Sequence, residues 1–202
     1  MPPIEQPVWG WMMKVAQGTI QMLSREDRHK LLHVARKTLE DFLGRGEVPE
    51  WSSKSPGLLQ KRGTFVTLWH RASEDLRGCC GEIDPRRPLI ESVARMAIAS
   101  ATRDPRFLPV TAGEVPVLRI EINALMPLTP IRVEAIEIGR HGLFLTQGVY
   151  SGLLLPDVAG RHGWSRDQYL GEVCLKAGLH EDAWRMPDAR LYGFESEKWG
   201  EE

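Results

Sequence analysis

Two adjacent cysteines, Cys79 and Cys80, lie between glycines in the stretch "LRGCCG" at residues 76–81. The β-branched and aromatic run before it and the stretch itself favour two extended strands. On such a strand neighbouring side chains point to opposite faces, so the two thiols diverge. This disfavours a disulfide between them. The six histidines supply no ligand pair near the cysteines, and we predict no metal site.

Cys79 shares its predicted face with Arg77 and precedes Arg86 and Arg87. The thiolate is the nucleophilic form of cysteine, and nearby positive charge stabilises it. The pattern therefore predicts that the Cys79 thiol has a pKa below the ordinary value and is a candidate catalytic nucleophile. The alternative is a purely structural cysteine. Cys80, on the other face, is predicted to fill a small space in the core.

The glycines on either side of the cysteines, Gly78 and Gly81, are candidate ligand contacts. A glycine has no Cβ, so a ligand or another backbone can approach the strand closely at that position. With Arg77 they predict a ligand pocket around residues 77–81.

A second set of polar side chains alternates with apolar ones in "LRIEINAL" at residues 118–125. Alternation places Arg119, Glu121 and Asn123 on one face of a strand, with the apolar residues on the other. Glu121 is a candidate catalytic acid or base, and Asn123 a candidate ligand contact. We predict that the strand at 76–83 lies beside this one, so that Arg77 and Cys79 face Glu121 or Asn123.

Asp104 and Arg106 are candidates for the wall of the same cleft, as ligand contacts. The alternative is structural: Asp104 turns the chain and Arg106 pairs with Glu121. His141, in "RHG" at 140–142, is a further candidate contact or base, with a turn residue as the alternative. Cys174 lies on the inward side of a predicted helix and is predicted to pack in a core.

The remaining periodicity predicts an α+β fold, a mostly antiparallel sheet with flanking helices, because helices and strands alternate without a regular rhythm. We predict an N-terminal extension at 1–23, a domain at 24–195 and a C-terminal tail at 196–202. Expected helices are at 24–43, from Pro88 to about 103, and at 165–178; expected strands are at 64–70, 76–83, 117–126, 142–156 as a hairpin, and 189–196.

Composition narrows the class of protein. The 202 residues carry a formal net charge of −1, which gives no general attraction to nucleic acid or to an anionic membrane. Three cysteines without a C-x-x-C spacing favour the reducing cytoplasm. No segment approaches the roughly 20 apolar residues of a membrane span. We therefore expect a cytoplasmic protein without a membrane partner, and no cofactor is predicted.

The chain resembles the AMMECR-one domain family over roughly residues 24–195. "LRGCCG" resembles the Leu-Arg-Gly-Cys-Ile-Gly hallmark of that family, with Cys80 in place of the usual aliphatic residue. Asn123 and Asp157 stand where Ser and Gln are usual, which puts any polar chemistry of relatives in doubt here. The other matching segments are "RDPRFLPVT" (103–111), "LRIEINALMPLTPI" (118–131), "GRHGLFL" (139–145), "GLLLPDVA" (152–159) and "CLKAGL" (174–179).

The resemblance implies an α+β fold with a larger sheet-bearing lobe and a smaller lobe. It implies no settled reaction. Prokaryotic members are often encoded with, or fused to, Memo-like and radical S-adenosylmethionine proteins, and an RNA-modification role has been suggested for such proteins. Memo-like and radical S-adenosylmethionine proteins are therefore the expected partners, together with an unknown small-molecule ligand.

Three functions follow as hypotheses. The favoured one is a component of such a modification system, with a ligand pocket around "LRGCCG" and its own catalysis undecided. The second is a thiol-dependent enzyme on a small or nucleotide-like anionic substrate, with Cys79 as nucleophile, Arg77 and Arg106 as anion anchors, and Glu121 as acid or base. The third is an RNA-binding or RNA-modification factor, which the even charge balance disfavours.

Overall fold

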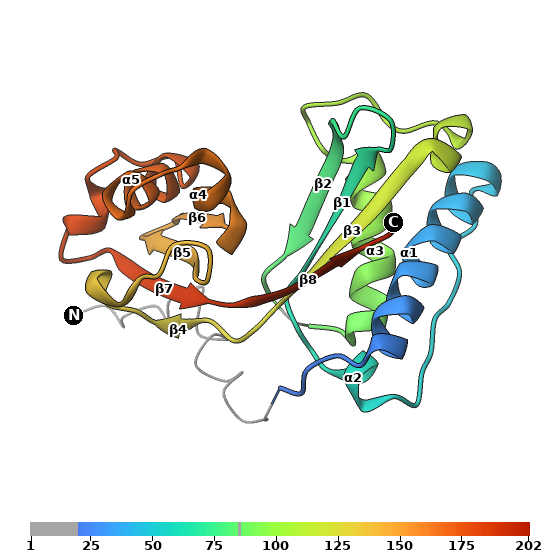
Figure 1. Cartoon of the computed structure of the whole chain (residues 1–202), viewed down its shortest axis with the longest axis horizontal. Helices are drawn as coiled ribbons and strands as arrows, with labels where there is room; N and C mark the ends of the chain where they lie inside the picture. Colours follow the sequence, from blue (N-terminus) through green and yellow to red (C-terminus); the bar gives the residue numbers. More distant parts are fainter. Residues whose placement is uncertain (1–19, 85) are drawn as a thin grey trace, which may run out of the picture. The chain divides into compact units, whose positions relative to one another are not determined.

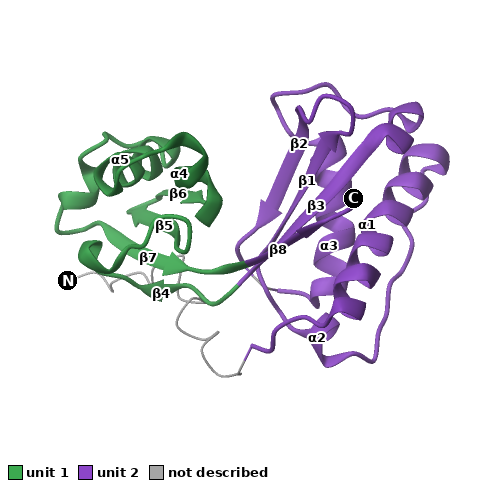
Figure 2. Cartoon of the chain, viewed as in Figure 1, with its two compact units in different colours: residues 1–19, 126–196 green, residues 20–125, 197–202 purple. Residues whose placement is uncertain are grey.

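The computed structural model describes residues 20–84 and 86–202 and divides the chain into two compact units. Unit 2 contains residues 20–125 and 197–202, and unit 1 contains the described residues 126–196 (Figure 2). The chain therefore leaves unit 2 once, builds unit 1, and returns to unit 2 for its last residues.

Unit 2 is a four-stranded sheet with two long helices on one face (Figure 1). Strand β1 pairs antiparallel with both β2 and β3, so it is an inner strand. The strand order is β2 (Leu76–Glu82), β1 (Thr64–His70), β3 (Leu118–Leu125) and β8 (Ser196–Gly200), and the helices are α1 (Arg25–Arg45), the short α2 (Pro56–Leu59) and α3 (Leu89–Thr102).

The core of unit 2 follows the predicted alternation of the strands. The face of β3 that carries Ile120 and Ile122 is fully buried, as is Val66 of β1. These side chains pack in one cluster with Leu31 of α1 and Val93 of α3. Burying each such side chain stabilises the fold by about 1.5–3 kcal/mol, so the apolar face determines where the helices lie.

Helix α1 begins and ends at residues of the kinds that the sequence indicated. The Ser24 hydroxyl accepts a hydrogen bond from the Asp27 backbone N–H at 3.0 Å, which satisfies a donor of the first turn. The helix runs two residues past the predicted end and stops at Gly46, whose φ of 72° is left-handed. Pro88 precedes the first turn of α3, as its N-cap.

Unit 1 has a second four-stranded sheet, covered by helices on which Val173 and Cys174 point inward. Both are fully buried with Leu143 and Leu145, which confirms the core position of Cys174. The strand order is β4 (Thr129–Pro130), β7 (Arg190–Phe194), β5 (Gly142–Gln147) and β6 (Tyr150–Leu154), with α4 (Pro156–His162) and α5 (Arg166–Lys176); the 3-10 turns of the chain are η2 (Ala112–Val117), η3 (Val133–Ala135) and η4 (Ala183–Arg185).

The predicted boundaries of the domain need correction at both ends. Residues 196–202 are not a tail, because Ser196–Gly200 forms β8 at the edge of the sheet of unit 2. Of the predicted extension 1–23, residues 1–19 lie outside the described part of the chain. Leu23 is buried in the core of unit 2, so the end of the predicted extension is part of the folded unit.

The predicted strands at 64–70 and 76–83, the hairpin at 142–156 and the helix that starts after Ser165 are confirmed. Helix α4 was not predicted, since seven residues are too few to show a helical period. Among the described residues, no helix has both the length and the apolar composition that crossing a membrane requires.

Candidate functional site

The predicted polar residues of β2 and β3 share one face of the sheet in unit 2, opposite α1 and α3. The register pairs Thr67 of β1 with Cys79 on one side and with Glu121 on the other. The Thr67 hydroxyl donates to Cys79 Sγ at 3.4 Å. On the far side, Lys198 Nζ of β8 lies 3.1 Å from Glu121 Oε2. We call these four residues the thiol row.

One part of the prediction for this face is wrong and one part is confirmed. The strands that carry Cys79 and Glu121 are not neighbours, because β1 lies between them. Strand β1 pairs with β2 along one edge and with β3 along the other. The two side chains nevertheless lie on the same face, because both oppose Thr67. The site therefore has Thr67 at its centre.

Asp104 holds the segment 103–111 against the cysteine strand. Its Oδ2 atom accepts from the Cys79 backbone N–H at 2.8 Å, so the "RDPRFLPVT" and "LRGCCG" segments meet at this bond. Arg106 donates to both carboxylate oxygens, at 2.9 and 2.6 Å. The Arg106 guanidinium lowers the pKa of Asp104 to about 2. The backbone N–H groups that donate to the carboxylate act in the same direction, and burial acts against them.

Asp104 therefore turns and ties the chain, as the structural alternative expected. The other half of that alternative is wrong, since Arg106 pairs with Asp104 and Glu121 pairs with Lys198. Arg106 keeps 55% of its side chain exposed while it makes this pair. An anion that used Arg106 would have to share it with the buried Asp104 carboxylate.

Arg77 is also engaged by a carboxylate. Its Nε atom donates to Glu114 at 2.8 Å, and its Nη1 atom donates to the Leu108 carbonyl at 3.0 Å. The Arg77 guanidinium lowers the pKa of Glu114 to about 2, assisted by hydrogen bonds from Thr111 and opposed by burial. Arg77 thus fastens the same 103–114 segment to β2 from a second point.

The two glycines of the motif are closely approached by the protein itself. A Cβ at Gly78 would lie 2.1 Å from the Ser100 carbonyl oxygen of α3, and one at Gly81 would lie 2.1 Å from the Phe65 ring. The absence of Cβ thus lets α3 approach the strand at Gly78. At Gly81 it makes room for an aromatic side chain beside the thiol row. Ligand contact at either glycine stays a prediction.

Cys80 points to the helix side of the sheet, as alternation requires. Its backbone N–H donates to Ser100 Oγ at 2.9 Å, and the same hydroxyl donates to the Val66 carbonyl at 2.7 Å. Burial raises the pKa of the Cys80 thiol, and the charges of Asp104 and Cys79 act in the same direction. These contacts agree with a packing role for Cys80.

The last two candidate contacts lie in different units. Asn123 is 2% exposed, and its position on β3 puts it on the face of the thiol row, opposite Phe65. His141 belongs to unit 1, where its Nδ1 atom accepts from the Glu137 backbone N–H at 3.0 Å in the turn before β5. His141 thus has the contacts of a turn residue, and its proposed role as a base stays a prediction.

Three further side chains of this face, Thr67, Lys198 and Trp69, were not among the predicted residues, whereas Arg119 was predicted to lie on it. Thr67 was detectable, because it lies at the middle of the strand predicted at 64–70. Lys198 was hidden by the interpretation of its segment as a tail. Trp69 and Arg119 oppose each other in the register, and the Arg119 guanidinium carbon lies 5.8 Å from the centroid of the Trp69 ring. The Trp69 Nε1 atom is buried and has no hydrogen-bond partner among the described residues.

The described residues hold no group of three or more histidine, cysteine, aspartate or glutamate side chains arranged for a metal ion. The chemistry that the face offers is therefore that of a thiol, a hydroxyl, a carboxylate–ammonium pair and aromatic rings.

This combination defines an α+β protein with two antiparallel sheets and a thiol-bearing sheet face in unit 2. The model of the AMMECR1 family matches residues 32–199, and the chain belongs to that family. The expected resemblance and the α+β fold are thereby confirmed.

Its relatives include archaeal proteins of similar length. Protein MK0488 of Methanopyrus kandleri is 40% identical over 190 residues, which cover 90% of this chain and 92% of the relative. Protein PH0010 of Pyrococcus horikoshii is 40% identical over 182 residues, covering 85% and 88%. The crystal structure of the latter, described as an uncharacterized protein, superposes with a TM-score of 0.81 at 39% identity and covers 86% and 90% of the two chains.

Proposed function

We propose that this AMMECR1 protein is a binding component of a modification system, working with Memo-like and radical S-adenosylmethionine proteins, and that the thiol row contacts the bound small molecule. The observation that carries the proposal is the alignment of Cys79, Thr67 and Glu121 on the face opposite the two long helices. The partner classes come from the family resemblance.

The spacing within the thiol row favours binding over direct acid–base catalysis between Cys79 and Glu121. The two residues are separated by two strand spacings, roughly 10 Å between their backbones. A base that takes a proton directly must lie within about 3 Å of it. The Thr67 hydroxyl between them donates to the sulfur. A small molecule that spans the row can therefore contact both ends without any proton passing between them.

The groups around the row favour a ligand with hydrogen-bond acceptors. Trp69 Nε1 is a buried donor without a protein partner among the described residues, and such donors are rare in folded proteins. Arg119 lies over the same ring, and Lys198 closes the far end of the row. A carbonyl, carboxylate or phosphate oxygen on this face would meet these cationic side chains, and it would reach the buried indole N–H only after a local movement that uncovers it.

The thiol-dependent enzyme is the second candidate, and the hydrogen bond from Thr67 to Cys79 Sγ favours it. Such a donor stabilises a thiolate, which is the reactive form. An enzyme of this kind would form a covalent bond from Cys79 to its substrate. A binding component would keep its ligand when sulfur is replaced by oxygen.

The test is co-expression of the full chain with the Memo-like and radical S-adenosylmethionine proteins of the same genome, followed by affinity purification and native mass spectrometry. We expect co-elution of at least one partner or of a small molecule. Lys198→Gln should weaken retention of the ligand about tenfold, because it removes one cationic contact to the ligand's oxygens. Lys54→Gln, the same change at an exposed lysine of unit 2, is the matched control.

Cys79→Ser separates the two candidates. Retained binding in this variant supports the binding component, whereas a covalent adduct on wild-type Cys79 that the variant lacks supports the enzyme. The proposal is overturned if neither partner nor ligand co-elutes, or if Lys198→Gln and Lys54→Gln behave alike.

A further inference from the structure

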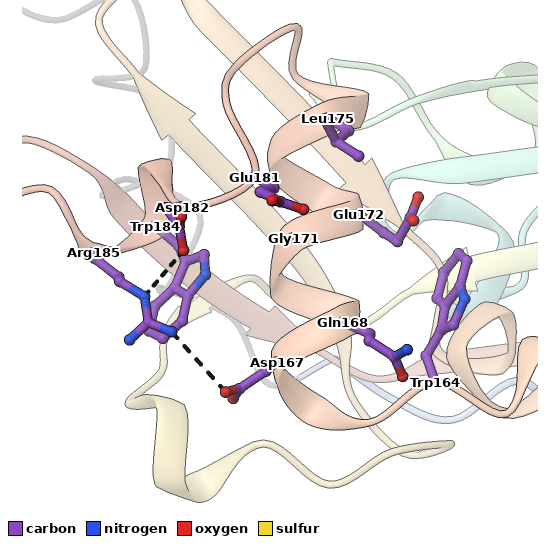
Figure 3. Close-up of a pocket in the computed structure, with 10 residues that line it drawn as sticks. All are labelled: Trp164, Asp167, Gln168, Gly171, Glu172, Leu175, Glu181, Asp182, Trp184 and Arg185. Atoms are coloured by element: carbon purple, nitrogen blue, oxygen red, sulfur yellow. Dashed lines mark hydrogen bonds and ion pairs between the residues drawn. The ribbon is translucent and has the colours of Figure 1, made fainter.

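A pocket lies in unit 1, between α5 and the segment that carries η4 (Figure 3). Its volume is about 410 Å³, which is within the range of small-molecule sites. Trp164 borders it at one end and Trp184 at the other, with the outer surface of α5 between them. None of the residues predicted from sequence for ligand binding lines this pocket.

The Trp184 end already holds a cation of the protein itself. The Arg185 guanidinium carbon lies 4.0 Å from the centroid of the Trp184 ring. Its Nε atom is 3.3 Å from Asp182 Oδ1, and its Nη2 atom is 4.0 Å from Asp167 Oδ2. An aromatic face and two carboxylates thus surround one positive charge, an arrangement known to bind organic cations.

The Trp164 end also combines an indole with a carboxylate, and no basic side chain lines the pocket there, although the His162 ring stacks on Trp164 with 4.5 Å between the ring centroids. Glu172 projects on the side of α5 that faces Trp164, and Glu181 lies over the middle of the helix (Figure 3). Neither carboxylate makes an ion pair within the described part of the chain. Among the residues that line the pocket, four are acidic and Arg185 alone is basic. The lining therefore carries an excess of negative charge, and Glu172 and Glu181 are its two acidic residues away from Arg185.

From this aromatic and acidic lining we infer that the pocket binds an organic cation, an alkylammonium group held between Trp164, Glu172 and Glu181. A small anion is disfavoured by the charge of the lining. A metal ion is disfavoured because these carboxylates do not form a metal-holding group within the described chain. An alkylammonium combines the charge that the carboxylates attract with methylene groups that pack on an indole. The inference concerns unit 1 and stands independently of the thiol row.

The first experiment titrates the full chain with 1,5-diaminopentane, followed by calorimetry and by the indole N–H signals in NMR. We expect saturable binding with a Kd on the order of 0.1–1 mM at low salt, weakened as salt screens the charges. 1,5-Pentanediol, of the same length without charge, should not bind. Nα-acetyl-lysine amide tests whether the ammonium can instead come from a protein lysine, and tighter binding of that compound would assign the lysine source.

Glu172→Gln and Glu181→Gln should each weaken binding about fivefold, as the loss of one charged contact of roughly 1 kcal/mol does. Glu40→Gln, which makes the same change in net charge in unit 2, should leave the Kd unchanged. Absence of saturable binding up to about 10 mM would overturn the inference. Equal effects of all three variants would also overturn it, because binding would then depend only on the overall charge of the protein.

A further variant should strengthen binding of the diamine. Arg185→Ala removes the internal cation from the Trp184 end, so the diamine should bind about fivefold more tightly, with both ammonium groups held. Arg25→Ala, at an exposed arginine at the start of α1, changes the net charge equally and is the control. Unchanged or weaker binding in Arg185→Ala, in a variant that is still folded, would contradict the two-ended pocket.

Discussion

Arg62, whose side chain is fully buried, places its Nη1 atom 2.6 Å from Oε1 of Glu197, 135 residues later in the chain. Arg62 also donates to the carbonyls of Ala124 and Leu125 at the end of β3. Glu197 accepts in addition from Arg28 of α1. The pair therefore joins β8 to the rest of unit 2, so the last residues of the chain belong to its structure.

Glu197→Gln should lower the free energy of unfolding by about 3–5 kcal/mol, because it leaves the buried Arg62 charge without its anion. Burial alone would raise the pKa of Glu197, but hydrogen bonds from Arg62 and Arg28 outweigh it and lower the pKa. Urea denaturation measures the change. Glu195→Gln, at an exposed glutamate paired with Arg140, is the control and should cost no more than about 1 kcal/mol. Equal effects would show that the buried pair adds nothing.

The sequence patterns were sufficient to predict most helices and strands and which face of a strand is buried. Alternation in 118–125 separated the buried Ile120 and Ile122 from Glu121, and Ser24 and Ser165 indicated where two helices begin. These features depend on residues close together in the chain, which is why periodicity reveals them.

The order of strands could not be derived in the same way. Whether β2 or β3 neighbours a given edge depends on contacts between segments tens of residues apart, and no local period encodes them. The pairing of Lys198 with Glu121 joins residues 77 positions apart, and the short polar segment that carries Lys198 shows no strand pattern of its own. The thiol row was therefore only half predictable.

Stability should depend on pH through Asp104. Its pKa is lowered from 3.8 to about 2 by Arg106, so its ionised form is favoured in the folded state. A lowered carboxylate pKa stabilises the fold above the unfolded value of 3.8, and this contribution is lost as the pH falls through about 2. The shift corresponds to roughly 2 kcal/mol.

Denaturation of wild type and Asp104→Asn at a series of pH values tests this. The wild type should be more stable by roughly 2 kcal/mol at pH 7, and most of that difference should disappear at pH 2. A difference that stays constant with pH would mean that the side chain stabilises the fold by its shape and its neutral hydrogen bonds, without the charge.

Gly78→Ala should destabilise unit 2 by about 3 kcal/mol, because the new Cβ would lie 2.1 Å from a backbone oxygen of α3 and the helix would have to move. Gly113→Ala adds the same methyl group in open space and should change stability by less than about 0.5 kcal/mol. Urea midpoints compare the two. A tolerated Gly78→Ala would show that α3 can shift and that Gly78 has another role.

General RNA affinity should be weak. The 26 lysines and arginines are balanced by 27 acidic residues, and too few basic residues cluster in the sequence to release many counterions from a phosphate backbone. Titration of mixed RNA in increasing salt should therefore show a shallow salt dependence and no submicromolar binding at physiological salt. Tight binding under those conditions would favour the RNA-binding hypothesis over the binding component proposed here.

The three cysteines should react in a fixed order, with Cys79 first. Cys174 is fully buried and burial raises the pKa of its thiol, and burial also raises the pKa of the Cys80 thiol on the helix side of the sheet. Cys79 lies on the other face, where the Thr67 hydroxyl donates to its sulfur. Iodoacetamide labelling of the folded protein, mapped by mass spectrometry over a range of pH, measures the three rates.

Substitutions should also distinguish the roles of Cys79 and Cys80. Thr67→Val removes the hydrogen bond to the sulfur and should slow labelling of Cys79 without changing that of Cys80. Cys79→Ala should cost little stability and impair ligand binding, whereas Cys80→Ala should cost about 1–2 kcal/mol through a small cavity. Preferential labelling of Cys80, or equally slow labelling of both, would leave Cys79 with a structural role, because a thiol that contacts a ligand must be reachable from solvent.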